Sequence, residues 1–273
     1  MFTQGPHIYL EESMINNSIT VITLTNNRIQ FLLRAIESVN KQNYNGRITH
    51  LILIDDCEAT RKFLEENKFI SSHDFQWEYI KRDTDHQHIS SRLSRIRNIG
   101  VNLARSKWIC FLDDDNEFEP DHLSSLVKCA TRTGCQAVYS WERIYWRDGS
   151  PYLVQEMPWC RNAEDRVKNY QLLTELGVFQ PGTNISRDRA DSRDHENPVW
   201  TVDMGEWLFE CALLKKYPFP EDYSELDWKD LTTEDDKLMK LIIDNKIQVA
   251  CSEQVTFKYY LGGFTSDFLV KPE

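Results

Sequence analysis

The sequence predicts an α/β fold in which a mainly parallel sheet has helices on both faces. Short, continuous apolar runs at residues 18–24, 50–54 and 108–112 are typical of strands that are buried on both sides. Segments with helical spacing separate these runs, and parallel strands require such crossover connections. The first half of the chain therefore indicates strand–helix units of an open, doubly wound sheet.

Strands and helices alternate through this first half. In the segment at 29–41, Leu32, Ile36 and Val39 lie three or four residues apart, which places them on one face of a helix. The helix at 121–131 follows Pro120, and proline is common at helix starts. We expect strands at 18–24, 50–54, 76–81 and 108–112, and helices at 29–41, 61–69, 90–104 and 121–131.

The second half is less regular. A turn at residues 147–150 (RDGS) predicts a hairpin between strands at 137–146 and 152–156. We expect helices at 162–176, 206–216 and 233–244, and a charged loop at 188–198. The simplest organisation is a polar leader at 1–17 and one domain at 18–273, with a ligand-binding half at 18–135 and a second half at 136–273 that faces another substrate.

Composition narrows the class of partner and the compartment. The chain has 273 residues and a net charge of -11, and nucleic-acid binders usually show an excess of basic residues. Seven cysteines, an odd number with no CxxC pair, disfavour both a disulfide framework and a thiolate zinc site. No long apolar run predicts a membrane span, and the first residues lack the pattern of a secretory signal. We expect a cytoplasmic protein.

Two acidic clusters follow predicted strands. Asp55 and Asp56 come after the second strand, and Asp113, Asp114 and Asp115 come after the fourth. Ligands of doubly wound sheets bind beyond these strand ends, and neighbouring carboxylates repel one another unless a cation neutralises them. A divalent cation that also binds phosphate oxygens suits such a cluster. The alternative is a pair of solvated acidic turns that cap the helices that follow.

A third acidic cluster begins the helix at 233–244. Thr232 or Thr233 is a candidate N-cap, and acidic residues favour the first helical turn, so a structural role is one interpretation. The other interpretation is that a carboxylate of Glu234 or Asp235 serves as a general base and takes a proton from an attacking hydroxyl.

A group of arginines lies between the first two acidic clusters. Arg92, Arg95 and Arg97 belong to the predicted helix at 90–104, whose N-terminus favours anions. These side chains are candidates for contact with a diphosphate. The alternative is a solvated helix face that forms ion pairs with nearby acidic residues.

These motifs, in this order, resemble the family 2 glycosyltransferases of the GT-A fold. The matching segments are 23–28 (TLTNNR), 38–42 (SVNKQ), 51–56 (LILIDD), 97–100 (RNIG) and 108–115 (WICFLDDD), with the pair Glu234 and Asp235. The resemblance spans most of the chain. It departs from the family at Cys57 and Glu58, where smaller residues are usual, and it lacks the QxxRW motif of processive synthases.

The resemblance implies an enzyme and assigns roles by position. It implies an inverting transfer of one sugar from a nucleotide-diphosphate sugar, with UDP as the default nucleotide, to an acceptor hydroxyl. Asp235 would be the catalytic base, and Asp115 with Asp113 would hold Mn²⁺ or Mg²⁺. Donor-nucleotide contacts would come from Thr23, Asn26, Arg28, Asp55, Asp56, Arg97, Asp113 and Asp114.

The acceptor would be bound by the second half. Aromatic faces suit sugar rings, and most of the eight tryptophans follow the acidic triplet. The candidate acceptor residues are Trp200, Asp203, Glu206, Trp207 and Glu234. Core packing is the alternative for each tryptophan, and the loop at 188–198 is either a lid or a solvated loop.

Two other functions stay open at this stage. A nucleotidyltransferase also uses aspartates and Mg²⁺, although the loop after the first strand lacks the glycines that are usual there. A sugar- or nucleotide-binding module that lost catalysis is the second, because fold does not imply activity. The sequence leaves open the sugar, the nucleotide, and whether the acceptor is a glycan, a peptide, a lipid-linked molecule or a small molecule.

Overall fold

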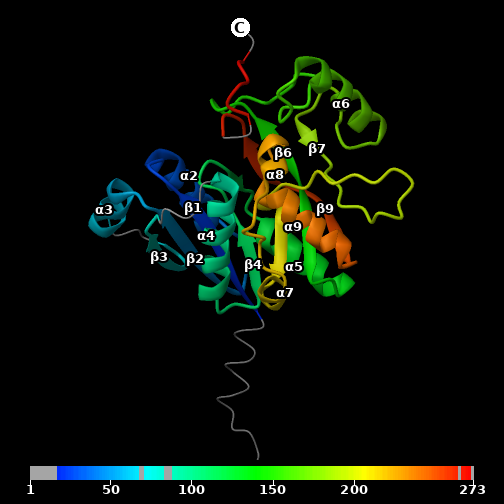
Figure 1. Cartoon of the computed structure of the whole chain (residues 1–273). Helices are drawn as coiled ribbons and strands as arrows, with labels where there is room; N and C mark the ends of the chain where they lie inside the picture. The colour runs from blue at the N-terminus through cyan, green and yellow to red at the C-terminus, as the bar shows by residue number, and fades with distance from the viewer. Residues whose placement is uncertain (1–16, 68–70, 83–87, 264–265, 272–273) are drawn as a thin grey trace, which may run out of the picture.

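The computed structural model describes residues 17–67, 71–82, 88–263 and 266–271. Its described strands form one sheet in the order β3, β2, β1, β4, β8, β6, β9 and β5, with β7 paired to β6 (Figure 1). The strands are β1 (Ser18–Thr25), β2 (Arg47–Asp55), β3 (Asp74–Ile80), β4 (Trp108–Phe111), β5 (Glu117–Phe118), β6 (Ala137–Tyr145), β7 (Ile185–Ser186), β8 (Trp207–Glu210) and β9 (Val249–Tyr260).

Helices cover both faces of this sheet, as the sequence predicts. The described helices are α2 (Ile29–Asn40), α3 (Glu58–Glu66), α4 (Ile89–Leu103), α5 (His122–Thr133), α6 (Ala163–Glu175), α7 (Cys211–Lys216), α8 (Glu225–Lys229) and α9 (Glu234–Asp244), with a 3₁₀ turn η1 (Met204–Glu206). Figure 1 shows α6 at one end of the molecule, away from α2, α3 and α4.

The parallel half of the sheet is built from β1, β2, β3 and β4. β1 pairs in parallel with β2 and with β4, so that Ile19 lies between Ile48 and Trp108. All eight residues of β1 are buried, which matches the prediction of a strand covered on both faces. The carboxyl ends of β1, β2 and β4 consequently meet at one edge of the sheet.

Alternation along each strand divides the core between two layers. On β1, Ile19 and Val21 pack in a cluster that includes residues of α2 and α5. Ile22 and Leu24 point to the opposite face, where they pack in a cluster that includes residues of α4, α7 and α9. The expected two-sided architecture is therefore confirmed.

The second half of the sheet differs from the expected hairpin. β6 pairs antiparallel with β8 and in parallel with β9, and residues 152–156 form no strand. Only an isolated bridge, between Tyr145 and Pro151, follows the turn at 147–150. The turn itself forms, since the Trp146 amide donates to the Ser150 carbonyl. The turn was predicted correctly because its signal is local. The strands that pair with β6 were not predicted, because β8 and β9 are distant in the sequence.

One other prediction is wrong, and one strand was not predicted at all. Residues 207–210 were expected to open a helix, but they form β8, and only α7 is helical. Four residues are too few to separate strand from helix by periodicity. β9 was missed because Glu253 has a φ of 58° and the register with β6 shifts between Tyr139 and Glu142, which interrupts the alternating pattern.

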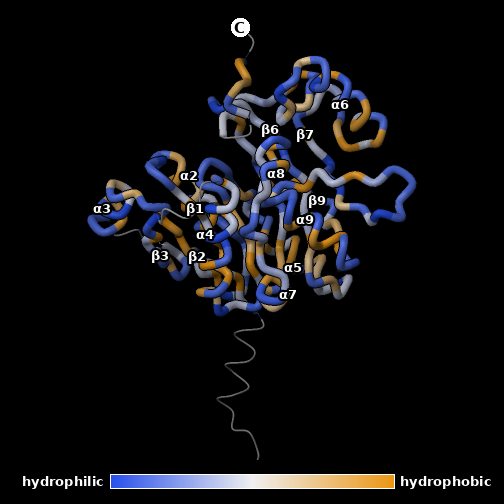
Figure 2. Tube along the Cα trace, viewed as in Figure 1, coloured by the Kyte–Doolittle hydropathy of each residue, from blue (hydrophilic) through white to orange (hydrophobic). Residues whose placement is uncertain are grey.

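The described part of the chain contains no helix with the length and apolar character needed to cross a membrane. The segment between β7 and η1 is largely hydrophilic (Figure 2) and includes the charged loop expected at 188–198. The leader expected at 1–17 lies outside the described residues except for Asn17.

Candidate active site

A cavity of about 590 Å³ opens at the carboxyl ends of the parallel strands. This is the edge where the sequence places its acidic clusters, and where ligands of doubly wound sheets bind. The lining comes from the ends of β1 and β2, from α4, from the segment after β4, and from the N-terminus of α9. The lining residues that were predicted to act at the site are Asn26, Arg28, Asp55, Arg97, Asp113, Asp115, Asp203, Glu234 and Asp235.

The turn after β1 places two polar side chains on the cavity wall. Asn27 has a φ of 52°, a left-handed conformation that asparagine tolerates, and it turns the chain toward α2. The Asn26 amide donates to the Asp55 carbonyl at 2.6 Å, which ties the ends of β1 and β2 together. Arg28 pairs with Asp114 and Asp115 of the acidic triplet.

Within the triplet, the three aspartates have different surroundings. Asp114 is fully buried and accepts from Arg28 Nε at 3.2 Å; burial raises the pKa of Asp114 to about 7, and Arg28 opposes that shift. Asp113 and Asp115 both line the cavity, and Asp115 accepts from Arg28 Nη1 at 2.7 Å. Burial also raises the pKa of Asp115, and the positive charge of Arg28 again opposes this shift. The cavity therefore meets the first and third carboxylates, while the second is held in the fold.

Asp113 and Asp115 fit a divalent cation. Their carboxylates supply hard oxygen ligands on one wall, and the side chain of Asp113 is 39% exposed to the cavity. Asp114, between them, is not part of the cavity lining and contacts Arg28. An ion at this wall would share Asp115 with Arg28 or displace that arginine.

Asp55 closes the far side of the cavity with two arginines. Its Oδ1 accepts from Arg92 Nη2 at 2.8 Å and from Arg92 Nε at 3.0 Å, and its Oδ2 pairs with Arg82 at 3.3 Å. Arg92 is buried, whereas more than half of the Arg82 side chain is exposed. Arg92 was considered above as a phosphate contact; here it serves first to hold Asp55.

Arg97 forms hydrogen bonds with carboxylates from two of the acidic clusters. Its Nη1 donates to Glu234 at 2.6 Å and to Asp235 at 2.8 Å, and its Nη2 donates to Asp113 at 3.2 Å. These carboxylates, against a large opposing effect of burial, raise the pKa of Arg97. Since the side chain is almost wholly buried, it is a fixed positive centre between α4, the acidic triplet and α9.

The N-terminus of α9 presents Asp235 to the cavity. Thr233 caps the helix in a reciprocal capping box with Asp236, so the structural interpretation of this cluster holds for those two residues. Asp235 is not used for capping and is 31% exposed. Burial raises its pKa well above the ordinary value, and Arg97 opposes this. A raised pKa makes a carboxylate a stronger base.

Several predicted residues lie away from the cavity. Thr23 is buried in β1, where its hydroxyl bonds His50 Nε2 at 2.9 Å. Asp56 turns toward Tyr79, whose hydroxyl donates to it at 2.8 Å. Trp207 is 1% exposed and stacks on Phe209 in the core, the alternative that was open for each tryptophan. Trp200 is 44% exposed but lines no part of this cavity.

Of the acceptor candidates, Asp203 and Glu234 face the cavity while Glu206 does not. Burial, with Asp113 nearby, raises the pKa of Asp203 to about 7. Sequence reasoning missed Asn116, Tyr259 and Gly263, which also line the cavity. Asn116 directly follows the triplet and was detectable by position, whereas Tyr259 belongs to the unpredicted strand β9.

The chain is similar in sequence to named proteins. WcaA of Escherichia coli (strain K12), a protein named for colanic acid biosynthesis, is 33% identical over 110 residues, which are 40% of this chain and 36% of WcaA. The chain thus spans about a third of the length of that relative.

Solved structures share the fold. S. aureus TarS, in complex with UDP-GlcNAc, superposes with a TM-score of 0.55 at 15% identity, over 94% of this chain and 62% of TarS. The mannosyltransferase PcManGT from Pyrobaculum calidifontis, in complex with GDP-Man and Mn²⁺, gives 0.54 at 14% identity, over 91% of this chain and 58% of PcManGT. At these identities the likeness establishes the GT-A-like fold.

The family itself follows from sequence. The description Glycosyl transferase family 2 matches residues 20–194, which is more than half of the chain and extends from β1 past the acidic triplet. Taken with the cavity at the strand ends and the carboxylates gathered around Arg97, this match shows that the chain belongs to glycosyl transferase family 2.

Proposed function

We propose that this protein transfers one sugar from a nucleotide-diphosphate sugar, a UDP-sugar by preference, to an acceptor hydroxyl, with inversion at the sugar carbon. The observation that carries the proposal is Arg97, which brings Asp113 and Asp235 to one cavity wall. A cation-binding carboxylate and a candidate base are the two groups that this transfer requires.

The donor would occupy the side of the cavity between β1, β2 and the acidic triplet. Asp55 and Asn26 offer a carboxylate and an amide at the strand ends, which suit the hydrogen-bonding groups of a nucleoside. Arg28 and Arg82 are partly exposed cations on this side and suit the diphosphate. TarS, whose structure contains UDP-GlcNAc, supports UDP as the first nucleotide to test.

Asp113 and Asp115 would hold Mn²⁺ or Mg²⁺ at this end. A divalent cation bound there offsets the negative charge that the leaving diphosphate acquires. The arginine contacts already present, Arg28 to Asp115 and Arg97 to Asp113, limit the motion of both carboxylates.

Asp235 would act as the general base. As the acceptor oxygen forms its bond to the sugar carbon, Asp235 takes the hydroxyl proton, and the bond from that carbon to the diphosphate breaks with its electron pair on the departing oxygen. Glu234 stays paired to Arg97 on the buried side, which leaves Asp235 as the more exposed carboxylate of the two. Asp203 lies on the same cavity and is the candidate to orient the acceptor.

Calorimetric titration with UDP, with and without Mn²⁺, tests the donor site. We expect Mn²⁺-dependent binding that Asp115→Ala abolishes. Hydrolysis and transfer assays with UDP-sugars would follow. If neither UDP nor GDP, dTDP or CMP binds with Mn²⁺, the proposed donor site is wrong and a non-catalytic binding module becomes the better interpretation.

A further inference from the structure

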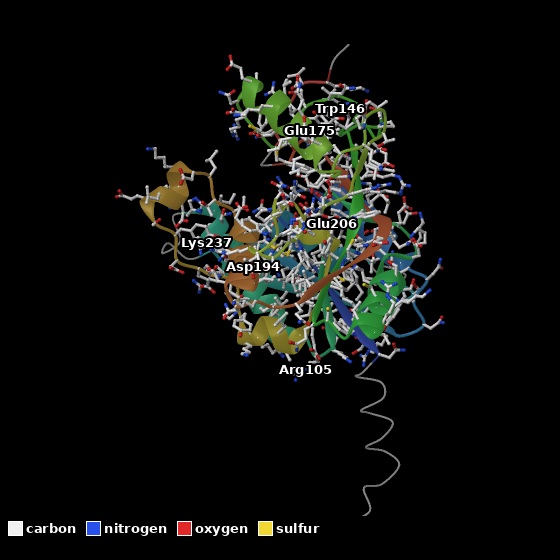
Figure 3. The ribbon with its side chains drawn as sticks, turned by 90° about the vertical axis from the view of Figure 1, so that its right-hand side faces the viewer. Arg105, Trp146, Glu175, Asp194, Glu206 and Lys237 are labelled. Carbon is white, nitrogen blue, oxygen red and sulfur yellow. The ribbon has the colours of Figure 1, made fainter. Side chains whose placement is uncertain are left out.

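A second group of carboxylates lies inside the fold, outside the cavity described above. Glu142 is on β6, Asp188 follows β7 by two residues, and Glu206 ends η1. One oxygen from each lies within 4.8 Å of the others, and the three residues are 1%, 1% and 0% exposed. Figure 3 shows Glu206 in the interior of the molecule.

These carboxylates lack the hydrogen bonds that buried polar groups normally make. Five of their six oxygens have no hydrogen-bond partner in the described structure. The sixth, Glu206 Oε2, accepts from the Asp203 amide at 2.8 Å. An unpaired buried polar atom costs about 1–3 kcal/mol, and a charged one costs more, so five such atoms in one place require an explanation.

Two serine hydroxyls belong to the same neighbourhood. Ser186 is the register partner of Glu142 across β6 and β7, and Ser140 lies two residues before Glu142 on the same face of β6. Both are fully buried, and both hydroxyl oxygens lack a hydrogen-bond partner among the described residues. The three carboxylates and these two hydroxyls together leave seven oxygen atoms without a hydrogen-bond partner among the described residues.

Among the described residues, no lysine, arginine or histidine forms an ion pair with any of the three carboxylates. Burial, with the neighbouring carboxylates, raises the pKa of Glu142 and Glu206, and burial raises that of Asp188 to about 6. The hydroxyls of Thr201 and Ser186 oppose the change at Asp188, although neither makes a hydrogen bond of standard geometry with it.

The spacing suits a cation of the hard type. Ca²⁺ binds oxygen at about 2.3–2.6 Å and Mg²⁺ at about 2.0–2.1 Å, so two oxygens on opposite sides of one ion lie about 4–5 Å apart. Three oxygens within 4.8 Å of one another can all reach such an ion. A ligand set made only of oxygen suits Ca²⁺ and Mn²⁺, and the absence of sulfur and imidazole from the group disfavours Zn²⁺ and Cu²⁺.

We propose that Glu142, Asp188 and Glu206 form a buried site for one divalent cation, Ca²⁺ or Mn²⁺, that is separate from Asp113 and Asp115. The ion would link three segments that are far apart in the sequence. Asp188 lies at the start of the hydrophilic segment between β7 and η1, and Glu206 follows that segment, so both of its ends would be fixed to β6.

The site would also position a residue of the cavity. Asp203 caps η1, and its amide is held by Glu206 in a reciprocal capping box. Fixing Glu206 therefore fixes the backbone from which Asp203 enters the cavity. In this proposal Glu206 is a positioning residue, and Asp203 is the group that faces substrate.

The test separates the two metal sites by mutation and does not depend on the proposed transfer. Equilibrium dialysis against Ca²⁺ and Mn²⁺, with metal analysis of the protein, would be made on the full chain carrying Asp113→Asn and Asp115→Ala. We expect one bound equivalent to remain. Adding Glu142→Gln and Glu206→Gln, which keep side-chain shape, should weaken that binding at least tenfold, whereas Glu156→Gln, at a carboxylate paired with Arg166, should not.

A second measurement covers the case in which the glutamine variant does not fold. Tb³⁺ bound to the chain with Asp113→Asn and Asp115→Ala should show luminescence sensitised by Trp207, which adjoins Glu206, and excess Ca²⁺ should remove it. The proposal is overturned if this chain holds no metal and sensitises no Tb³⁺. It is also overturned if the glutamine variant folds and binds metal as well as its parent, because the ion would then lie elsewhere.

Discussion

Arg97 Nη1 donates to Asp235 Oδ1 at 2.8 Å, although the two residues are 138 positions apart. This contact attaches the N-terminus of α9 to α4, beneath the cavity. The aromatic rings of Phe111 and Phe219 each lie 5.7 Å from the Arg97 guanidinium carbon, so the cation is enclosed on its apolar sides as well. Several tests of the site start from this contact.

Replacing Arg97 with lysine should impair both stability and activity. Lysine keeps the charge but lacks the planar fork that reaches Asp113, Glu234 and Asp235 at once. Breaking a buried ionic network typically costs about 3–5 kcal/mol of unfolding free energy. Urea unfolding and a transfer assay would measure the two effects. Arg105→Lys, at an exposed arginine just past the end of α4 and low in the view of Figure 3, is the matched control, and equal losses in both variants would contradict the assigned role.

Asp235→Asn should abolish sugar transfer and leave the donor bound. Loss of a general base lowers turnover by about 10²–10⁴-fold, while amide and carboxylate have the same shape. UDP titration and a transfer assay on the same preparation would show the separation. Asp236→Asn, one residue along and engaged in the Thr233 cap, should cost up to about 1 kcal/mol of stability and leave turnover nearly unchanged. Full activity in Asp235→Asn would remove Asp235 from the mechanism.

Of Asp55, the last residue of β2, and Asp56, which follows it, only Asp55 should matter for the donor. Asp55 lines the cavity and is held by Arg92, whereas Asp56 turns to Tyr79. Asp55→Asn should weaken UDP binding at least tenfold, which is about 1.4 kcal/mol. Asp56→Asn should change it by less than about threefold in the same titration, and asparagine tolerates the φ of 48° at this position. The reverse order of effects would place the nucleoside on the other side of β2.

Buried histidines should make the fold sensitive to mild acid. Burial lowers the pKa of His50 and of His122 to about 3, from 6.5. Both are therefore neutral in the folded protein while the unfolded chain takes up protons below 6.5. The part of the unfolding free energy that depends on these two histidines is fully present above pH 6.5. It is lost as pH falls toward 3, at up to about 1.4 kcal/mol per pH unit for each histidine.

Unfolding curves between pH 7.5 and 5 would measure this slope. In His122→Asn an atom of the side-chain amide can replace His122 Nδ1 as the hydrogen-bond partner of the Thr256 hydroxyl. The slope should fall in this variant, because one proton-binding group is gone. The same substitution at His195, whose side chain is 47% exposed, is the surface control. An equal slope in all three proteins would mean that carboxylates, not histidines, govern acid unfolding.

The parallel half of the fold was readable from the sequence because its signals are local. The apolar runs of β1, β2 and β4 are continuous, and the acidic clusters follow directly, so Asp55, Asp113 and Asp115 were placed at the cavity edge by topology alone. It is harder to predict which of two adjacent residues faces the cavity, since successive side chains point in different directions. That is why Asp56 and Asp114 were grouped with neighbours that face the cavity while they do not.

The second half depends on contacts between distant segments. The aromatic character of Trp207 was visible, but its direction is set by pairing of β8 between β4 and β6. Tyr259 reached the cavity through a strand that sequence periodicity did not reveal. Glu142, Asp188 and Glu206 share no spacing in the sequence that would associate them, and only the folded sheet brings their oxygens together.

The position of β9 has a consequence for how the protein folds. β9 is the last strand of the described chain, yet it lies between β6 and β5 rather than at an edge. It provides Thr256, the partner of His122, and Tyr259, part of the cavity wall. During synthesis, the edges of β6 and β5 that pair with β9 stay unpaired until residues 249–260 have been made. Such long-range pairing is slow, so the second half of the sheet is the part most exposed to aggregation while the chain is being made.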